Sequence, residues 1–278
     1  MQVRFVDLGG GVRTRCYVAG TAGPNLVLVH GGGAAADTWV RVIEALAQHA
    51  RVYAPDLIGH GFADYVAPGP GETPQRFQLR HLLRFLDALE LDRYVVAGSS
   101  FGGLIAALLY FERPKAMEKL ILVGSSSVFH PPEKKGGSVS DAAANQLPAL
   151  TNPSRESIRK RNVGSNFDKS DVFEEIVLAQ LTAFGLPGRV EMFQYTTNGL
   201  RESANQPAHQ VYARLEQIAV PTLVISGRDD PRADWRVVEA EAKRLPKATV
   251  ALFDRCGHKP FSEQAPLFIE TVARFLKT

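Results

Sequence analysis

The segment from Arg93 to Glu112, RYVVAGSSFGGLIAALLYFE, contains the pattern that decides the fold. Its first residues, Tyr94 to Val96, are aromatic or β-branched and predict a buried strand. After a break of glycine and serine, leucine and isoleucine recur at helical spacing. Because Ser100 lies between the expected strand and the expected helix, it would occupy a sharp turn with its hydroxyl exposed. Gly98 and Gly102 lack the Cβ atoms that would collide where the chain turns back.

Two other interpretations of this segment compete. Residues 94–111 carry no charge, so length alone would allow a membrane-spanning helix. The glycine and serine residues in the middle, preceded by a strand pattern, disfavour that interpretation. The second alternative is a coincidental G-x-S-x-G match in an ordinary strand–helix unit. A coincidental match becomes improbable if a general base, an acid and a second oxyanion donor follow other strands.

Composition narrows the class of protein. The chain has 278 residues, 45% hydrophobic and 22% charged, which is typical of a globular protein with a sizeable core. Asp7 lies where a signal peptide would need an apolar stretch, and Cys16 and Cys256 cannot form a disulfide framework. We therefore expect a cytoplasmic location. The net charge is +3, and we interpret the basic clusters at 159–161 and 134–135 as solvated, with no nucleic-acid or membrane partner.

Strand and helix patterns alternate along most of the chain. Strands are expected at residues 3–8, 12–19, 25–29, 52–54, 94–96, 120–123, 220–225 and 249–253. Helices are expected to start at Asp37 or Thr38, at Thr73–Pro74, after Ser100, near Trp235 and near Pro266. This alternation predicts an α/β fold with a mostly parallel, doubly wound sheet.

The alternation stops after the sixth expected strand. Residues 129–215 show loop and helix patterns instead, with aromatic and sulfur-containing side chains at Phe129, Phe167, Phe173, Phe184, Met192, Phe193 and Tyr195. We interpret this segment as a helical cap inserted into a core formed by residues 1–128 and 216–278. Most of those side chains are expected in the cap core, with one or two in a substrate pocket.

Two further strands are followed by residues that carry chemistry. Asp229 and Asp230 follow one strand, and His258 lies on a glycine-preceded loop after the last strand. The carboxyl ends of parallel strands are where α/β folds place catalytic groups. A serine hydroxyl needs a neutral imidazole to take its proton and a carboxylate to orient that imidazole. The order serine, acid, histidine therefore predicts nucleophilic catalysis.

The chain resembles the α/β-hydrolases over nearly its whole length. The matching pieces are LVLVHGGG, PDLIGHG, VVAGSSFGG, LVISGRDD and CGHKPFSEQAP. Within that superfamily, the HGGG loop with the Cys-Gly-His loop is similar to the cap-bearing C–C bond hydrolases of meta-cleavage pathways and to small esterases. The resemblance implies Ser100 as nucleophile, His258 as base and Asp230, rather than Asp229, as the acid.

The resemblance also implies an oxyanion hole. Its donors would be the backbone amides of Phe101 and Gly32, with Gly31, Gly33 and Ser99 as neighbouring loop or substrate contacts. Ser99 and Lys259 depart from the C–C hydrolases, which usually carry asparagine before the serine and an aromatic residue after the histidine.

The sequence thus predicts a serine hydrolase acting on an ester, lactone or thioester of a small to medium, largely apolar substrate. The alternatives are a C–C bond hydrolase and a non-catalytic ligand-binding protein of the same fold. We interpret His30 as a support for its loop and His60 as a turn residue. No histidine pair has metal-ligand spacing, so no metal or other cofactor is expected. The oligomeric state is left open, with a homodimer as one option.

Overall fold

The computed structural model describes residues 1–131, 146–203 and 206–278 and contains an eight-stranded sheet. The strands are β1 (Gln2–Asp7), β2 (Arg13–Ala19), β3 (Asn25–Val29), β4 (Arg51–Pro55), β5 (Tyr94–Ser99), β6 (Met117–Val123), β7 (Thr222–Gly227) and β8 (Ala248–Phe253). Their order is β1-β2-β4-β3-β5-β6-β7-β8, and β2 is antiparallel to both neighbours. The strands from β4 to β8 pair in parallel, which confirms the predicted α/β fold.

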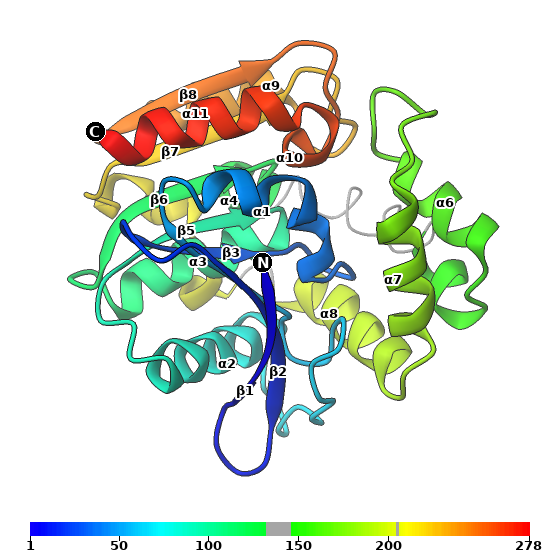
Figure 1. Ribbon diagram of the computed structural model, residues 1–278. Helices are drawn as coiled ribbons and strands as arrows, with labels where there is room; N and C mark the ends of the chain where they lie inside the picture. The colour runs from blue at the N-terminus through cyan, green and yellow to red at the C-terminus, as the bar shows by residue number, and fades with distance from the viewer. Residues whose placement is uncertain (132–145, 204–205) are drawn as a thin grey trace.

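Helices cover both faces of the sheet (Figure 1). α1 (Val40–Leu46) and α11 (Ala265–Lys277) lie on one face, whereas α2 (Pro74–Ala88), α3 (Phe101–Glu112) and α9 (Trp235–Ala242) lie on the other. The short helices of the core are α4 (Ser126–Phe129), α10 (Pro260–Glu263) and the 3₁₀ turn η1 (Ala36–Trp39). Along β3, Leu26 and Leu28 join the core that contains Trp39, while Val27 and Val29 join the core on the other face. This alternation explains why the strand is apolar throughout.

Helix starts agree with the sequence in one case and differ in another. Thr73 caps α2, with its side chain accepting from the backbone of Arg76, and Pro74 takes the first helical position. Asp37, in contrast, makes no side-chain cap: it lies inside η1 and pairs with Arg15. An ion pair between β2 and η1 therefore engages Asp37, one of the two residues that the sequence offered as a helix start, and Thr38, the other, also lies inside η1.

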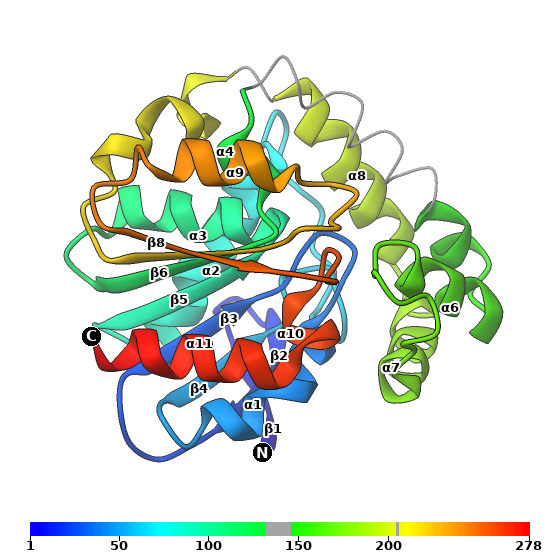
Figure 2. The same cartoon turned by 90° about the horizontal axis from the view of Figure 1, so that it is seen from above.

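The described residues between the sixth and seventh strands are largely helical, as predicted. It contains α6 (Arg155–Val163), α7 (Glu174–Phe184) and α8 (Arg189–Glu202), and residues 146–151 are helical as well. The 3₁₀ turns η3 (Pro207–His209) and η4 (Tyr212–Gln217) lead back to β7. Figure 2 shows α6 and α7 set apart from the layered core, with α8 nearer to it. The boundaries of the cap at residues 129 and 215 stay a prediction.

Membrane insertion of the segment at residues 94–111 is not what the structure shows. This segment divides into the strand β5 and the helix α3, and α3 has 12 residues. Across the described part of the chain, no helix combines the length and apolarity that crossing a membrane requires.

Arg15 forms a buried ion-pair network that we expect to stabilise the fold. It contacts Asp37 at 2.7 Å and Asp56 at 2.8 Å, and the three side chains are 7%, 7% and 0% exposed. Arg15→Met would leave two buried carboxylates uncompensated, so we expect a loss of about 3–5 kcal/mol in the free energy of unfolding, measured with urea. The control is Arg93→Met, because Arg93 is 72% exposed in its pair with Glu118 and should matter by about 0–1 kcal/mol. Equal unfolding midpoints for both variants would contradict this expectation.

Candidate active site

Ser100 lies on a strained turn between β5 and α3. Its φ of 53° and ψ of −119° fall in a region that costs a non-glycine residue about 1–3 kcal/mol. A Cβ atom on Gly98 would lie 2.3 Å from the Gly102 carbonyl oxygen, and one on Gly102 would lie 2.4 Å from the His30 carbonyl oxygen. Only glycine fits at both positions, so the sequence motif and the turn geometry agree.

The loop after β3 lies beside this turn. A Cβ atom on Gly31 would be 3.3 Å from Ser100 Cβ, and one on Gly32 would be 3.7 Å from Phe101 Cβ. Phe101 is the first residue of α3, where a backbone N–H has no acceptor within its helix. The loop and the helix start therefore bring backbone amides close to the serine.

Gly33 is turned toward the cap instead. It has a φ of +67°, a Cβ there would lie 2.9 Å from the Phe193 ring, and its carbonyl oxygen accepts from the Arg161 guanidinium. Of the loop glycines named from the sequence, Gly31 and Gly32 line the pocket at Ser100, and Ser99 lines it as well.

His30 holds the loop in place. Its Nε2 accepts a hydrogen bond of 2.8 Å from the Leu57 backbone, and its Nδ1 donates to the Gly31 carbonyl oxygen at 2.8 Å. Burial lowers the pKa of His30 to about 4, so the ring is neutral at pH 7. These contacts confirm the interpretation of His30 as a support. His60 is buried in its turn, with its ring 5.4 Å from that of His30.

His258 and Asp230 are in direct contact. His258 Nδ1 lies 2.8 Å from Asp230 Oδ2, and the two side chains are 5% and 0% exposed. The other oxygen of Asp230 accepts from the Arg232 backbone at 2.8 Å, whereas Asp229 is exposed. His258 Nε2 has no hydrogen-bond partner among the described residues, so it is not bonded to Ser100 in this structure. Such bonds are often long in a free enzyme and shorten when substrate binds.

The loop that carries His258 is bonded to the cap. The His258 backbone donates to the Ser165 carbonyl oxygen at 2.9 Å. The Glu263 carboxylate accepts from the backbone amides of Gly257 at 2.9 Å, Lys259 at 3.0 Å and Phe167 at 2.7 Å. One carboxylate thus joins the histidine loop to cap residue Phe167.

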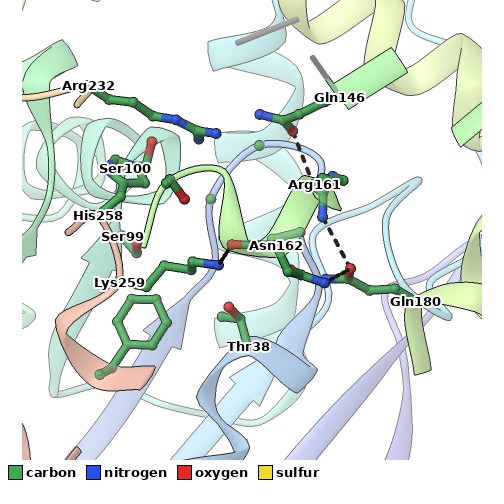
Figure 3. Close-up of a pocket in the computed structure, with 15 residues that line it drawn as sticks. Thr38, Ser99, Ser100, Gln146, Arg161, Asn162, Gln180, Arg232, His258 and Lys259 are labelled. Atoms are coloured by element: carbon green, nitrogen blue, oxygen red, sulfur yellow. Dashed lines mark hydrogen bonds between the residues drawn. The ribbon is translucent and has the colours of Figure 1, made fainter. Parts of the chain in front are cut away.

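A pocket of about 60 Å³ opens at Ser100 and His258 (Figure 3). Polar side chains supply most of its lining, including Thr38, Gln146, Asn162, Gln180 and the cations described next. None of the cap aromatics named from the sequence is among the described residues that line it. The expectation that one or two of these side chains line the substrate pocket is therefore not met in this part of the site, where the cap turns polar residues inward.

Arg161, Arg232 and Lys259 line this pocket, and none forms an ion pair with a carboxylate of the described residues. Burial lowers the pKa of all three, to about 9 for Arg161 and about 7 for Lys259. Among the described residues, the Arg161 guanidinium donates hydrogen bonds only to carbonyl oxygens, two of them on Gln146 and Gln180 at 3.2 Å each. Unpaired cations of this kind favour a negatively charged ligand.

The sequence interpretation missed these cations. The cluster at 159–161 was expected to be solvated, and this is wrong for Arg161, whose guanidinium points into the pocket; residues 134–135 lie outside the described residues. A usable signal was the helical spacing between Ile158, which is fully buried, and Arg161 three positions later. Lys259 was noted as a departure from the family pattern, and its position beside His258 was the clue to a charged pocket.

Comparisons with known proteins identify the family to which this fold belongs. The sequence model of a family described as alpha/beta hydrolase fold matches residues 24–265. The chain is 31% identical over 277 residues to a 2-hydroxy-6-oxo-2,4-heptadienoate hydrolase of Pseudomonas putida strain F1, covering 97% of this chain and 94% of that protein. It is 30% identical over 286 residues to a 2-hydroxy-6-oxononadienedioate/2-hydroxy-6-oxononatrienedioate hydrolase of Burkholderia vietnamiensis, covering 99% and 94%.

A solved structure shows the same fold. It is the 2-hydroxy-6-oxo-6-phenylhexa-2,4-dienoate hydrolase of Rhodococcus sp. strain RHA1, with a TM-score of 0.80, 24% identity and full coverage of both chains. Sequence family, relatives and architecture lead to one conclusion: this chain belongs to the α/β-hydrolase fold family and is a hydrolase.

Proposed function

We propose that the chain hydrolyses a bond next to a carbonyl group in a substrate that carries a carboxylate, with Ser100 as nucleophile. His258 takes the serine proton, and Asp230 keeps the His258 tautomer and stabilises the imidazolium. The amides of Phe101 and Gly32 would hold the oxyanion as the tetrahedral intermediate forms. One such donor contributes about 3 kcal/mol to transition-state stabilisation.

The observation that supports a carboxylate-bearing substrate is the cationic pocket beside Ser100. Arg161, Arg232 and Lys259 face it without carboxylate partners among the described residues. A neutral, apolar ester would leave these half-buried charges unbalanced, which costs free energy. The names of two relatives specify dienoate and dienedioate compounds, which carry carboxylates. We therefore favour C–C bond hydrolysis of such a conjugated keto acid over hydrolysis of an apolar ester.

The two reactions share their first half. The serine oxygen adds to the carbonyl carbon, and the bond to the neighbouring atom breaks. In C–C hydrolysis the departing carbon takes the electron pair, delocalised over the conjugated acid, and receives the proton held by His258. In ester hydrolysis an oxygen departs and takes that proton. Water then attacks the acyl group on Ser100, with His258 as base, and releases a carboxylic acid.

A two-substrate assay distinguishes these reactions. One substrate is 2-hydroxy-6-oxo-2,4-heptadienoate, followed by loss of its visible colour, and the other is the neutral ester 4-nitrophenyl acetate. We expect the higher kcat/KM for the dienoate, because only that compound can pair with the pocket cations. Faster turnover of the neutral ester would favour an esterase. Absence of turnover of both, with no labelling by a fluorophosphonate, would favour the ligand-binding alternative for this particular chain.

A further inference from the structure

The pocket contains more positive charge than one carboxylate can balance. Among the described residues, the carboxylates of Asp230, Glu263 and Asp171 act on Arg232 or Lys259, and each has other partners. Asp230 contacts His258, Glu263 accepts from three backbone amides, and Asp171 pairs with Arg41 at 3.1 Å. In the described part of the chain, the heads of Arg161, Arg232 and Lys259 therefore have no carboxylate partner within hydrogen-bonding distance.

The three cations approach the pocket from both of its walls. Arg232 follows Asp230 by two residues and Lys259 follows His258 directly, so both come from the core. Arg161 comes from cap helix α6. Figure 3 shows Arg232 and Lys259 extending from the His258 side toward the cap residues, with Arg161 between Gln146 and Gln180. Lys259 Nζ donates to the Asn162 carbonyl oxygen at 2.6 Å.

We propose that this pocket selects a substrate with two anionic groups, and that Arg161, Arg232 and Lys259 are its specificity-determining residues. The inference deepens the proposed function and rests on it for the location of the reacting carbonyl. A substrate with one carboxylate would leave two of the three cations without an anionic partner. A second carboxylate gives these cations a charge-assisted hydrogen-bonding partner that no described residue of the protein provides.

Binding of an anion beside Lys259 should be accompanied by measurable proton uptake. Burial, together with the charges of Arg161 and Arg232, lowers the pKa of Lys259 to about 7. Glu263 and Asp171 act in the opposite direction. At pH 8 the free protein therefore holds Lys259 mainly neutral, and a bound anion raises its pKa and draws a proton onto it. Affinity for the anion should accordingly fall as the pH rises above about 7.

The test separates binding from chemistry by using the Ser100→Ala protein. The probes are a conjugated 6-ketodienoate whose far end carries a second carboxylate and the same compound with that group as a carboxamide. The two probes have nearly the same shape and differ in one charge. Titration calorimetry should show about 10- to 100-fold tighter binding of the dicarboxylate, the range expected for a charged hydrogen bond. In two buffers of different ionisation enthalpy at pH 8, it should also show proton uptake.

Single substitutions show which residues produce the preference for the dicarboxylate. Arg161→Met, Arg232→Met and Lys259→Met should each reduce the preference for the dicarboxylate, and Lys259→Met should also abolish the proton uptake. Arg155→Met is the matched control, because Arg155 lies on the same helix α6 with its side chain 60% exposed in a pair with Glu174. It should retain the full preference.

The outcomes distinguish the two proposals. Equal binding of both probes, binding of neither, or a preference that survives all three cation substitutions would overturn the inference. A clear preference in the Ser100→Ala protein, combined with no C–C cleavage by the unsubstituted protein, would overturn the proposed reaction and leave the dianion site standing.

Discussion

Ser100→Ala is expected to lower kcat by about 10⁴- to 10⁶-fold while the protein stays folded. The substitution removes the attacking oxygen, while the neighbouring hydroxyl of Ser99 belongs to a different backbone position at the end of β5. The hydroxyl makes no hydrogen bond to a described residue, and alanine meets the same backbone strain at φ 53°. The free energy of unfolding should therefore change by about 0.5 kcal/mol or less.

Two measurements check this expectation. Turnover of the dienoate gives the loss in kcat, and intact-mass analysis after fluorophosphonate treatment shows whether one adduct forms on the unsubstituted protein and none on the variant. Thermal unfolding controls for misfolding. Near-full activity of a folded Ser100→Ala protein, or an adduct mapped to Ser99, would contradict the assignment of the nucleophile.

Asp230→Asn is expected to lower kcat by about 10³- to 10⁴-fold. Asp230 is buried and holds His258 Nδ1 at 2.8 Å. An amide is nearly the same size but carries no charge, so it cannot stabilise the imidazolium, and its NH₂ group can hold the wrong tautomer. Turnover at several pH values measures the loss, since an effect through the imidazole should change the pH profile as well as the rate.

Asp229→Asn is the control for this prediction. Asp229 is the neighbouring carboxylate, and it is exposed rather than in contact with His258. We expect its replacement to leave turnover near the unsubstituted level. A larger loss from Asp229→Asn than from Asp230→Asn would reverse the assignment of the acid.

The fold could be predicted because local patterns and the global arrangement agree. β3 and β5 are apolar on both faces, and the sheet buries both faces. The start of α2 follows from Thr73 and Pro74 alone. The sequence offered Asp37 or Thr38 as the start of a helix, and both lie inside η1 instead. The partner of Asp37, Arg15, is distant in sequence, and a long-range ion pair leaves no local signal.

The site could be predicted only in part, for a related reason. Ser100, Asp230 and His258 each follow a strand, so the topology of a parallel sheet brings them to one edge. Arg161 reaches the same pocket from an inserted helix, whose inward face is marked in the sequence only weakly, by the spacing between Ile158 and Arg161. The positions of the candidate serine, acid and histidine in the sheet could therefore be predicted from the sequence, whereas the polarity of the pocket beside them could not.

The Glu263 carboxylate couples the movement of the cap to that of the loop that carries His258. Residues 165–167 and the histidine loop share its hydrogen bonds and the bond from the His258 backbone to Ser165. Moving this part of the cap outward would break bonds that fix the imidazole. Two routes for substrate entry are then possible. Either substrate enters elsewhere along the cap, or opening the cap at residues 165–167 displaces the His258 imidazole. In the second case, water that enters meets a misaligned imidazole until the cap closes again.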